Sequence, residues 1–384
     1  MIPPNPNDAP ADGPEARQYN RIRRRLAVFD YLLGLAVLLV LLGTGWTQQL
    51  RDSAYLWAGQ RYVLAVFLYF LMLTVLAKVL GIGFDYYGFR VEHQFHLSNQ
   101  KLPSWLWDEA KDWFLGLVLG TVLVELLYSL IRLAPRYWWL LAWAAFLILF
   151  TGLAQIAPVV VFPLFYKFRP LQREDLRDRL TRLGERAATR VRGVYEWKLS
   201  QKSKKANAAL TGLGKTRRII LSDTLLEQYS DDEIEAVLAH ELGHHVHRHI
   251  PKNIFIQAVI TLAGFWAAAR ILHYAVHLRH LFEEDYDFAN LPLLILVATL
   301  LSLVALPAIN AWMRYHERQA DRYVFRSLPS VVPFITAMNK LARQNLAERS
   351  PSRLVEWLFH SHPSISKRIA AAEAWSQEHK AATP

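Results

Sequence analysis

The sequence predicts a mainly α-helical bundle of about six membrane spans, joined to a smaller α+β unit in the cytoplasm. Three features support this fold class. Six apolar segments are each long enough to cross a bilayer, which takes about 20 residues. Lys and Arg gather in every second connection between them, and a helix with the motif H-E-x-x-H lies between the fourth and fifth segments.

The apolar segments are too many and too long to be buried core helices of one soluble domain. They lie at 26–46, 62–84, 113–133, 137–163, 254–272 and 291–312. The predicted organisation is a disordered basic N-terminus at 1–25, four membrane helices within 26–163, a cytoplasmic segment with a small sheet and the H-E-x-x-H helix at 164–251, two membrane helices within 252–312, and cytoplasmic helices at 313–384.

The distribution of Lys and Arg orients the chain. The N-terminal arginine cluster, segment 167–252 and the C-terminal region are strongly basic, whereas the connections after the first, third and fifth spans hold few basic residues. Because basic connections stay in the cytoplasm, both termini and the H-E-x-x-H helix are expected there. The net charge of +11 then fits contact with the anionic lipid of the bilayer, and no nucleic-acid partner is expected.

The H-E-x-x-H helix has a defined start. Ser230 followed by Glu233 is a capping box, in which each side chain satisfies a backbone N–H of the other residue. His240 and His244 are four residues apart, so on a helix both imidazoles leave the same face and can bind one zinc ion. Glu241 stands beside the first histidine, where its carboxylate can act as a general base. The alternative is a helix end with solvated histidines.

The sequence contains no cysteine, so the remaining zinc ligand must be a histidine or a carboxylate. The last apolar segment runs directly into R-Y-H-E-R-Q-A-D. Glu317 lies about one turn beyond the membrane and suits the third ligand, and Asp321, one turn further on the same face, suits the acceptor that fixes a ligand histidine. His316 is the competing candidate, although it points to a different side of this helix.

Residues that could contact a substrate flank the metal helix. Short strands are expected at 191–198, 207–211 and 218–222, and an exposed edge strand beside the metal can pair with an extended peptide. Near the C-terminus, His362 precedes a proline, and Arg368 follows. This pair could stabilise an oxyanion or hold a peptide backbone. An ordinary surface loop is the alternative.

Taken together, these residues resemble the type I CAAX prenyl endopeptidases, which are integral-membrane zinc metallopeptidases of the gluzincin kind. The resemblance extends from about residue 60 to the C-terminus. Its matching blocks, in order, are A-P-V-V-V-F-P-L-F-Y-K-F-R-P-L at 157–171, N-A-A-L-T-G-L-G-K-T-R-R-I-I-L-S-D-T-L-L at 207–226, the H-E-L-G-H helix, E-R-Q-A-D at 317–321 and S-H-P-S-I-S-K-R at 361–368.

The resemblance implies a gluzincin-like peptidase domain with one zinc ion, held by His240, His244 and Glu317, and with Glu241 as the base. It also implies that His362 acts in catalysis. The residues that it implies for contact with the substrate are Asn207, His362 and Arg368.

The expected activity is hydrolysis of peptide bonds in membrane-associated or prenylated polypeptides at the cytoplasmic side. This chain has six spans where eukaryotic members of the family have seven, so a general membrane-protein quality-control protease is an alternative. A catalytically silent scaffold or chaperone is another, but such a protein need not retain Glu241. A metal transporter would need ligands inside the spans, and the two motif histidines lie outside them.

Overall fold

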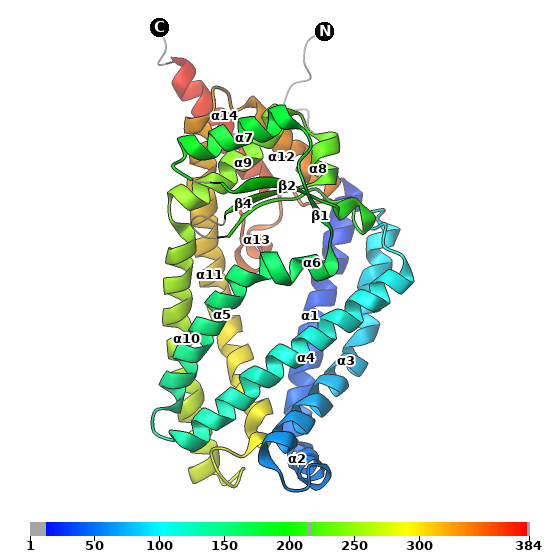
Figure 1. The fold of residues 1–384 in the computed structure, drawn as a ribbon, viewed down its shortest axis with the longest axis vertical. Coiled ribbons are helices and arrows are strands. Elements are labelled where there is room, and N and C mark those ends of the chain that lie inside the picture. The colour runs from blue at the N-terminus through cyan, green and yellow to red at the C-terminus, as the bar shows by residue number, and fades with distance from the viewer. Residues whose placement is uncertain (1–12, 190, 213–216, 382–384) are drawn as a thin grey trace.

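The computed structural model describes residues 13–189, 191–212 and 217–381 (Figure 1). Within these residues, six helices are long and apolar enough to cross a membrane, as the sequence predicts. Each helix covers most of one predicted apolar segment, and several continue beyond it. The six are α1 (Pro14–Gly43), α3 (Tyr62–Gln94), α4 (Leu102–Leu133), α5 (Trp138–Val160), α10 (His249–His273) and α11 (Leu291–Ser327).

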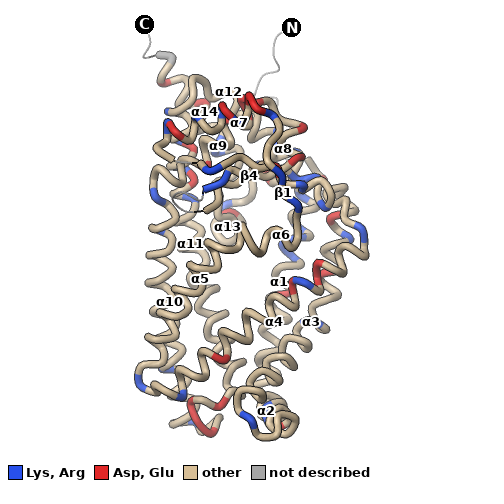
Figure 2. The backbone as a smooth tube through the Cα atoms, viewed as in Figure 1, with Lys and Arg blue, Asp and Glu red and all other residues tan. Residues whose placement is uncertain are grey.

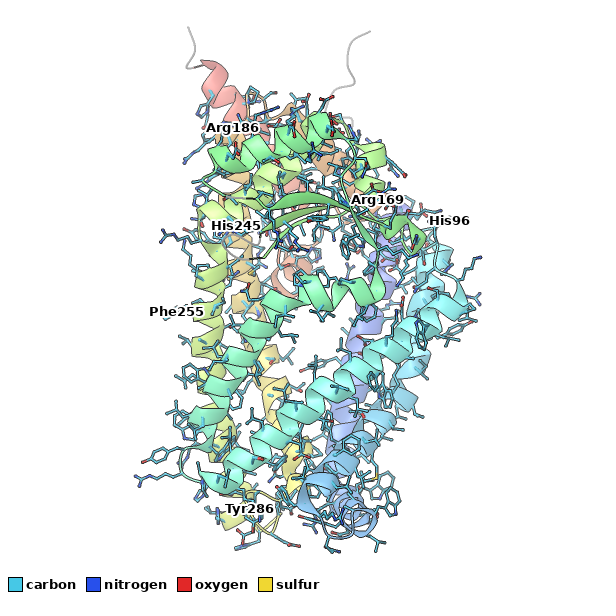
Figure 3. The ribbon with its side chains drawn as sticks, in the orientation of Figure 1. His96, Arg169, Arg186, His245, Phe255 and Tyr286 are labelled. Carbon is cyan, nitrogen blue, oxygen red and sulfur yellow. The ribbon has the colours of Figure 1, made fainter. Side chains whose placement is uncertain are left out.

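The surface of these helices is that of a membrane protein. Between 0% and 17% of each apolar window is buried inside the protein, so most of these side chains face outward. Phe255, for example, lies on the outer side of α10 and is 66% exposed (Figure 3). Figure 2 shows that charged residues gather at the two ends of the bundle and are sparse between them. Exposed apolar surface of this extent requires lipid as its solvent.

The end of the bundle away from the sheet is closed by α2 (Trp46–Trp57) and by the loop between α10 and α11. Phe288 in this loop is fully buried, with its ring centroid 5.1 Å from that of Tyr55 and 5.2 Å from that of Tyr69. The adjacent Asp287 accepts a hydrogen bond of 2.5 Å from Arg51 of α2. These contacts tie the loop to α2 and α3.

The prediction of a disordered N-terminus over 1–25 is wrong for residues 14–25, which form the first turns of α1. Pro14 suits the first turn of a helix, and long-range contacts hold the segment in place. The Tyr19 hydroxyl donates to Glu92 at 2.5 Å, and the Asn20 side chain donates to the carbonyl of Leu346 at 2.6 Å. Such contacts are invisible in local composition. Residues 1–12 lie outside the described part of the chain.

The second part of the protein contains a sheet with the strand order β1-β2-β4-β3. β2 and β4 are parallel, and β3 lies at the edge, antiparallel to β4. Three of these strands were predicted, and β1 was not. The strands are β1 (Phe168–Pro170), β2 (Gly193–Trp197), β3 (Ala208–Thr211) and β4 (Arg218–Ser222).

Helices cover this sheet and enclose one apolar core (Figure 1). Leu180 of α7, Ile219 of β4 and Leu238 of α9 are fully buried within it. Burial of this face of α9 fixes how the helix is turned relative to the sheet. The helices of this part are α6 (Phe162–Phe165), α7 (Glu174–Arg186), α8 (Asp223–Gln228), α9 (Asp231–Val246), α12 (Val332–Gln344), α13 (Arg353–Phe359) and α14 (Ile365–Ala381).

The two parts meet where α9 packs on α11. Gly243 is the point of closest approach: a Cβ atom there would lie 2.9 Å from the Cα of Ala320 and 3.1 Å from the Cβ of Tyr323. The backbone of α9 at Gly243 therefore lies directly against the backbone of Ala320 and the Cβ of Tyr323. The absence of a Cβ lets the backbones approach closely enough for α9 and α11 to share a site.

This contact predicts the effect of adding one methyl group. Gly243→Ala should lower the free energy of unfolding by roughly 1–3 kcal/mol, because the new methyl overlaps backbone atoms that cannot turn aside. Thermal unfolding in detergent measures the change. Gly264→Ala on α10 is the control, since a Cβ there meets nothing within 4 Å. Equal unfolding temperatures for both variants would show that the close contact does not exist.

Candidate functional site

The start of α9 is fixed by the predicted capping box. The Ser230 side chain accepts a hydrogen bond of 3.3 Å from the backbone N–H of Glu233, and the Glu233 carboxylate accepts one of 2.8 Å from the backbone N–H of Ser230. Both bonds satisfy amide groups that a helix leaves unpaired at its first turn. With the start and the buried face fixed, the two motif histidines are directed toward α11.

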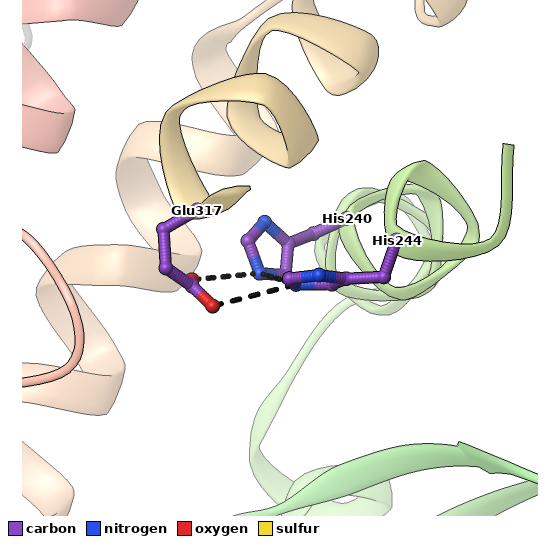
Figure 4. A group of neighbouring side chains, drawn as sticks. All are labelled: His240, His244 and Glu317. Atoms are coloured by element: carbon purple, nitrogen blue, oxygen red, sulfur yellow. Dashed lines mark hydrogen bonds and ion pairs between the residues drawn. The ribbon is translucent and has the colours of Figure 1, made fainter. Parts of the chain in front are cut away.

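His240, His244 and Glu317 meet at this junction (Figure 4). The Glu317 carboxylate oxygens lie 3.2 Å from His240 Nε2 and 3.4 Å from His244 Nε2. The two Nε2 atoms are 3.2 Å apart. Three potential ligand atoms from two helices thus surround one point, and the side chain of Glu317 is only 3% exposed.

His240 is oriented by a buried charged network. Its Nδ1 lies 2.9 Å from Asp321 Oδ1, and because a carboxylate only accepts, Nδ1 carries the proton. Nε2 is then left as a lone pair directed into the site. Asp321 in turn accepts hydrogen bonds of 2.9 Å from Nε and 2.6 Å from Nη2 of Arg368. The guanidinium therefore balances the charge of the carboxylate that holds the histidine.

His244 is oriented by His249, a residue that the sequence reasoning missed. Arg248 has a φ of 54°, which turns the chain sharply after α9, so that α10 begins at once and His249 faces back. His249 Nε2 donates to the amide oxygen of Gln319 at 3.0 Å, which leaves its Nδ1 as the acceptor for His244 Nδ1, 2.9 Å away. His244 Nε2 is thus also a lone pair. The histidine-rich end of the motif was the available signal.

His316, the competing ligand candidate, lies outside this cluster. Its ring is fully buried and stacks on His249, with ring centroids 3.9 Å apart and planes 6° from parallel. Neither ring nitrogen forms a hydrogen bond within the described residues. Its contact with the site is therefore through packing on His249.

The electrostatics of the cluster favour a cation. Burial lowers the pKa of His240, but hydrogen bonds to Asp321 and Glu317 outweigh burial and raise it to about 9. Burial and the charge of His240 lower the pKa of His244 to about 3, so this imidazole stays neutral. Burial raises the pKa of Glu241. Asp321 and Glu317 thus favour positive charge at His240, and a metal ion bound at its Nε2 atom would supply that charge in place of a proton.

The donor set fits a divalent metal ion. Glu317 is buried, its two carboxylate oxygens lie close to the Nε2 atoms of His240 and His244, and these ligand atoms converge on one point. Three carboxylates, those of Glu241, Glu317 and Asp321, converge here with the single guanidinium of Arg368, so that two negative charges remain when all are ionised. A divalent cation would balance them. Two imidazoles and a carboxylate form a common donor set for such ions.

A cavity of about 420 Å³ opens beside this cluster. It brings together residues that are far apart in the sequence, and the edge strand β3 begins directly after one of them. His362 is 58% exposed on the side chain and places Nε2 3.3 Å from Glu317 Oε1. Among the residues that line the cavity are Asn207, His240, Glu241, His362 and Arg368.

Arg368 has a role beside the predicted contact with a substrate. The sequence suggested that it contacts the substrate, but its side chain is only 11% exposed and makes a two-point contact with Asp321. It also borders the cavity. Arg368 therefore holds Asp321 in position. It can contact a substrate only through the part of its side chain that faces the cavity.

Comparisons with known proteins agree with this geometry. The family model described as "Peptidase family M48" matches residues 170–376, and that described as "CAAX prenyl protease N-terminal, five membrane helices" matches residues 11–167. The "Uncharacterized metalloprotease YhfN" of Bacillus subtilis is 33% identical over 75% of this chain and 68% of its own length. The "CAAX prenyl protease 1 homolog" of Arabidopsis thaliana is 28% identical over the same shares.

The fold is also similar to that of a solved structure. The crystal structure of S. mikatae Ste24p superposes with a TM-score of 0.85, covering 97% of this chain and 92% of that one at 23% sequence identity. The membrane spans and the sheet-containing part therefore occur together in a known fold. The chain belongs to peptidase family M48 and is a membrane metalloendopeptidase.

Proposed function

We propose that this chain is a zinc endopeptidase that hydrolyses peptide bonds of membrane-associated or prenylated, CAAX-type polypeptides at the cytoplasmic side. The observation that carries the proposal is the buried His240, His244 and Glu317 cluster, with Glu241 beside it in the wall of a cavity. Zinc is the metal that such donors bind in peptidases. The names of the relatives support a prenylated substrate.

The residues divide the work of hydrolysis. Zinc, when bound to His240, His244 and Glu317, would supply Lewis-acid polarisation. Glu241 removes a proton from the attacking water as the water oxygen bonds to the carbonyl carbon, and then delivers that proton to the leaving amine nitrogen as the C–N bond breaks. His362 faces the same cavity and is placed to donate to the oxyanion.

Two features support an extended, lipid-linked substrate. β3 is an edge strand that begins directly after Asn207, so a peptide in the cavity can pair with its backbone. A second cavity of about 410 Å³ lies between α5, α10 and α11 and is lined mainly by apolar side chains, including Phe146, Phe265 and Leu294. It is suited to a hydrocarbon chain that enters from the membrane.

The first prediction from this proposal concerns the general base. Glu241→Gln should reduce turnover by at least about 100-fold, because general-base catalysis is typically worth that much, while the metal content stays at the wild-type value. The assay uses an internally quenched CAAX peptide with a farnesylated cysteine, together with metal analysis of the purified protein. Glu227→Gln, an exposed residue of α8, is the matched control.

The same assay separates the proposed substrate from the alternatives. Cleavage of the farnesylated peptide, with little cleavage of the same peptide lacking the farnesyl group, supports the prenylated class. Equal cleavage of both identifies a general membrane protease. If Glu241→Gln retains activity within about tenfold of wild type, Glu241 is not the base.

The second prediction ranks three variants of α11 by zinc affinity. Glu317→Ala should lose far more than 100-fold, because it removes a ligand. Asp321→Asn should lose roughly 10- to 100-fold, as for residues that only orient a ligand. His316→Phe should match wild type, since it preserves the stack on His249. Zinc titration of chelator-stripped protein gives the order, and loss of zinc by His316→Phe but not by Glu317→Ala would overturn the ligand assignment.

The third prediction concerns the proposed orientation, with both termini and the cluster in the cytoplasm. The chain has no cysteine, so single cysteines can be placed at exposed positions. Glu174→Cys and Gln377→Cys should react with an impermeant maleimide only after cells are permeabilised, whereas Arg136→Cys should react in intact cells. None of these positions is a helix cap, unlike the exposed serines Ser230 and Ser352, which cap α9 and α13. Labelling of Glu174→Cys in intact cells would reverse the orientation.

A further inference from the structure

A second group of metal-ligating side chains lies at the opposite end of α10. His273 ends α10, His277 follows in the π-helical turn Tyr274–Leu278, and Asp285 lies in the loop that leads to α11. One ligand atom from each of the three lies within 4.8 Å of the others. Figure 3 places Tyr286, the neighbour of Asp285, at the end of the bundle away from the sheet and from His245. This group is therefore separate from the catalytic cluster.

The backbone directs both histidines to one side. They are four residues apart, and the wider π-helical turn between them keeps their rings close, with centroids 4.5 Å apart. His277 Nε2 is 3.2 Å from Asp285 Oδ1. Single π-helical turns occur frequently at functional sites. Both histidines are exposed, so an ion can reach them from solvent.

The Asp285 carboxylate has one oxygen atom without a hydrogen-bond partner among the described residues. Its Oδ1 is shielded from solvent and accepts no hydrogen bond of good geometry within the described residues, although His277 lies nearby. Its backbone carbonyl accepts a hydrogen bond of 2.9 Å from the Asn290 side chain. A carboxylate oxygen that is shielded and unsatisfied is unfavourable unless a cation or a donor approaches it.

The surrounding charge and the donor types indicate the class of ion. Glu283, Glu284 and Asp287 lie within two residues of Asp285 along the chain. Arg51 pairs with Glu283 and Asp287, so these four acidic residues and Arg51 together carry a net negative charge. Two imidazoles and one carboxylate suit zinc, cobalt, nickel or copper, whereas calcium and magnesium prefer sites made of oxygen ligands. Three protein ligands leave further positions for water.

We propose that His273, His277 and Asp285 form a second site for a divalent transition-metal ion, at the end of the bundle opposite the catalytic cluster. The ion fastens the end of α10 to the loop before α11. That loop also carries Asp287, paired with Arg51 of α2, and so the ion strengthens the closure of this end of the bundle. The proposal is independent of the peptidase chemistry.

Metal stoichiometry tests the site. The purified full chain in detergent is stripped with a chelator, equilibrated with micromolar zinc and analysed for metal per chain. Wild type should hold two ions and the double variant His273→Ala/His277→Ala one. His280→Asn is the matched control, because it removes a neighbouring exposed histidine while asparagine tolerates the positive φ of 52° at this position. It should hold two.

A more conservative variant separates the loss of a metal ligand from a loss of folding. Asp285→Asn keeps the volume of the side chain and removes its charge, and it should weaken the binding of the second ion by at least about tenfold while the first ion stays bound. Wild type that binds one ion at micromolar zinc, a double variant that still binds two, or a control that loses an ion would each overturn the assignment. If the double variant binds none, the affinity of Asp285→Asn decides the question.

Discussion

The close contact between α9 and α11 is the constraint on which the site depends. Gly243 lets the backbone of α9 approach that of α11 at Ala320, and only at this distance can imidazoles from one helix share an ion with a carboxylate from the other. α9 belongs to the sheet-containing part, whereas α11 continues a membrane span. The cluster is thus assembled at the junction of the two parts, and it bridges them.

The two histidines of the cluster are held by different means. His240 is hydrogen-bonded to Asp321, a buried carboxylate whose charge is balanced by Arg368. His244 is hydrogen-bonded to the neutral ring of His249. A second carboxylate at that position would add uncompensated negative charge to a buried site that already has an excess. The asymmetry therefore limits the charge that the protein must bury in the absence of a metal ion.

The membrane part contributes position and access. Charged residues reappear along α11 from Arg314 onward and include Glu317, so the cluster lies just beyond the apolar stretch of this helix. A cavity with an edge strand on one side lies beside the cluster, and a second, apolar cavity lies between the spans. Under the proposed function, the first cavity takes the peptide and the second takes its hydrocarbon chain.

The features that depend on local spacing were predictable from the amino-acid sequence alone. These are the apolar spans, the capping box and the shared face of His240 and His244, because each follows from helix periodicity within a few turns. Glu317 was also within reach, since its place follows from the length of the last span.

The features that depend on contacts between distant parts of the chain follow from the tertiary structure. It pairs Arg368 with Asp321, turns His249 back against His244, and orders the start of α1 by contacts with Glu92 and Leu346. No local pattern encodes these partners. Each partner is chosen by which buried donor, acceptor or charge would otherwise remain unsatisfied when the helices pack.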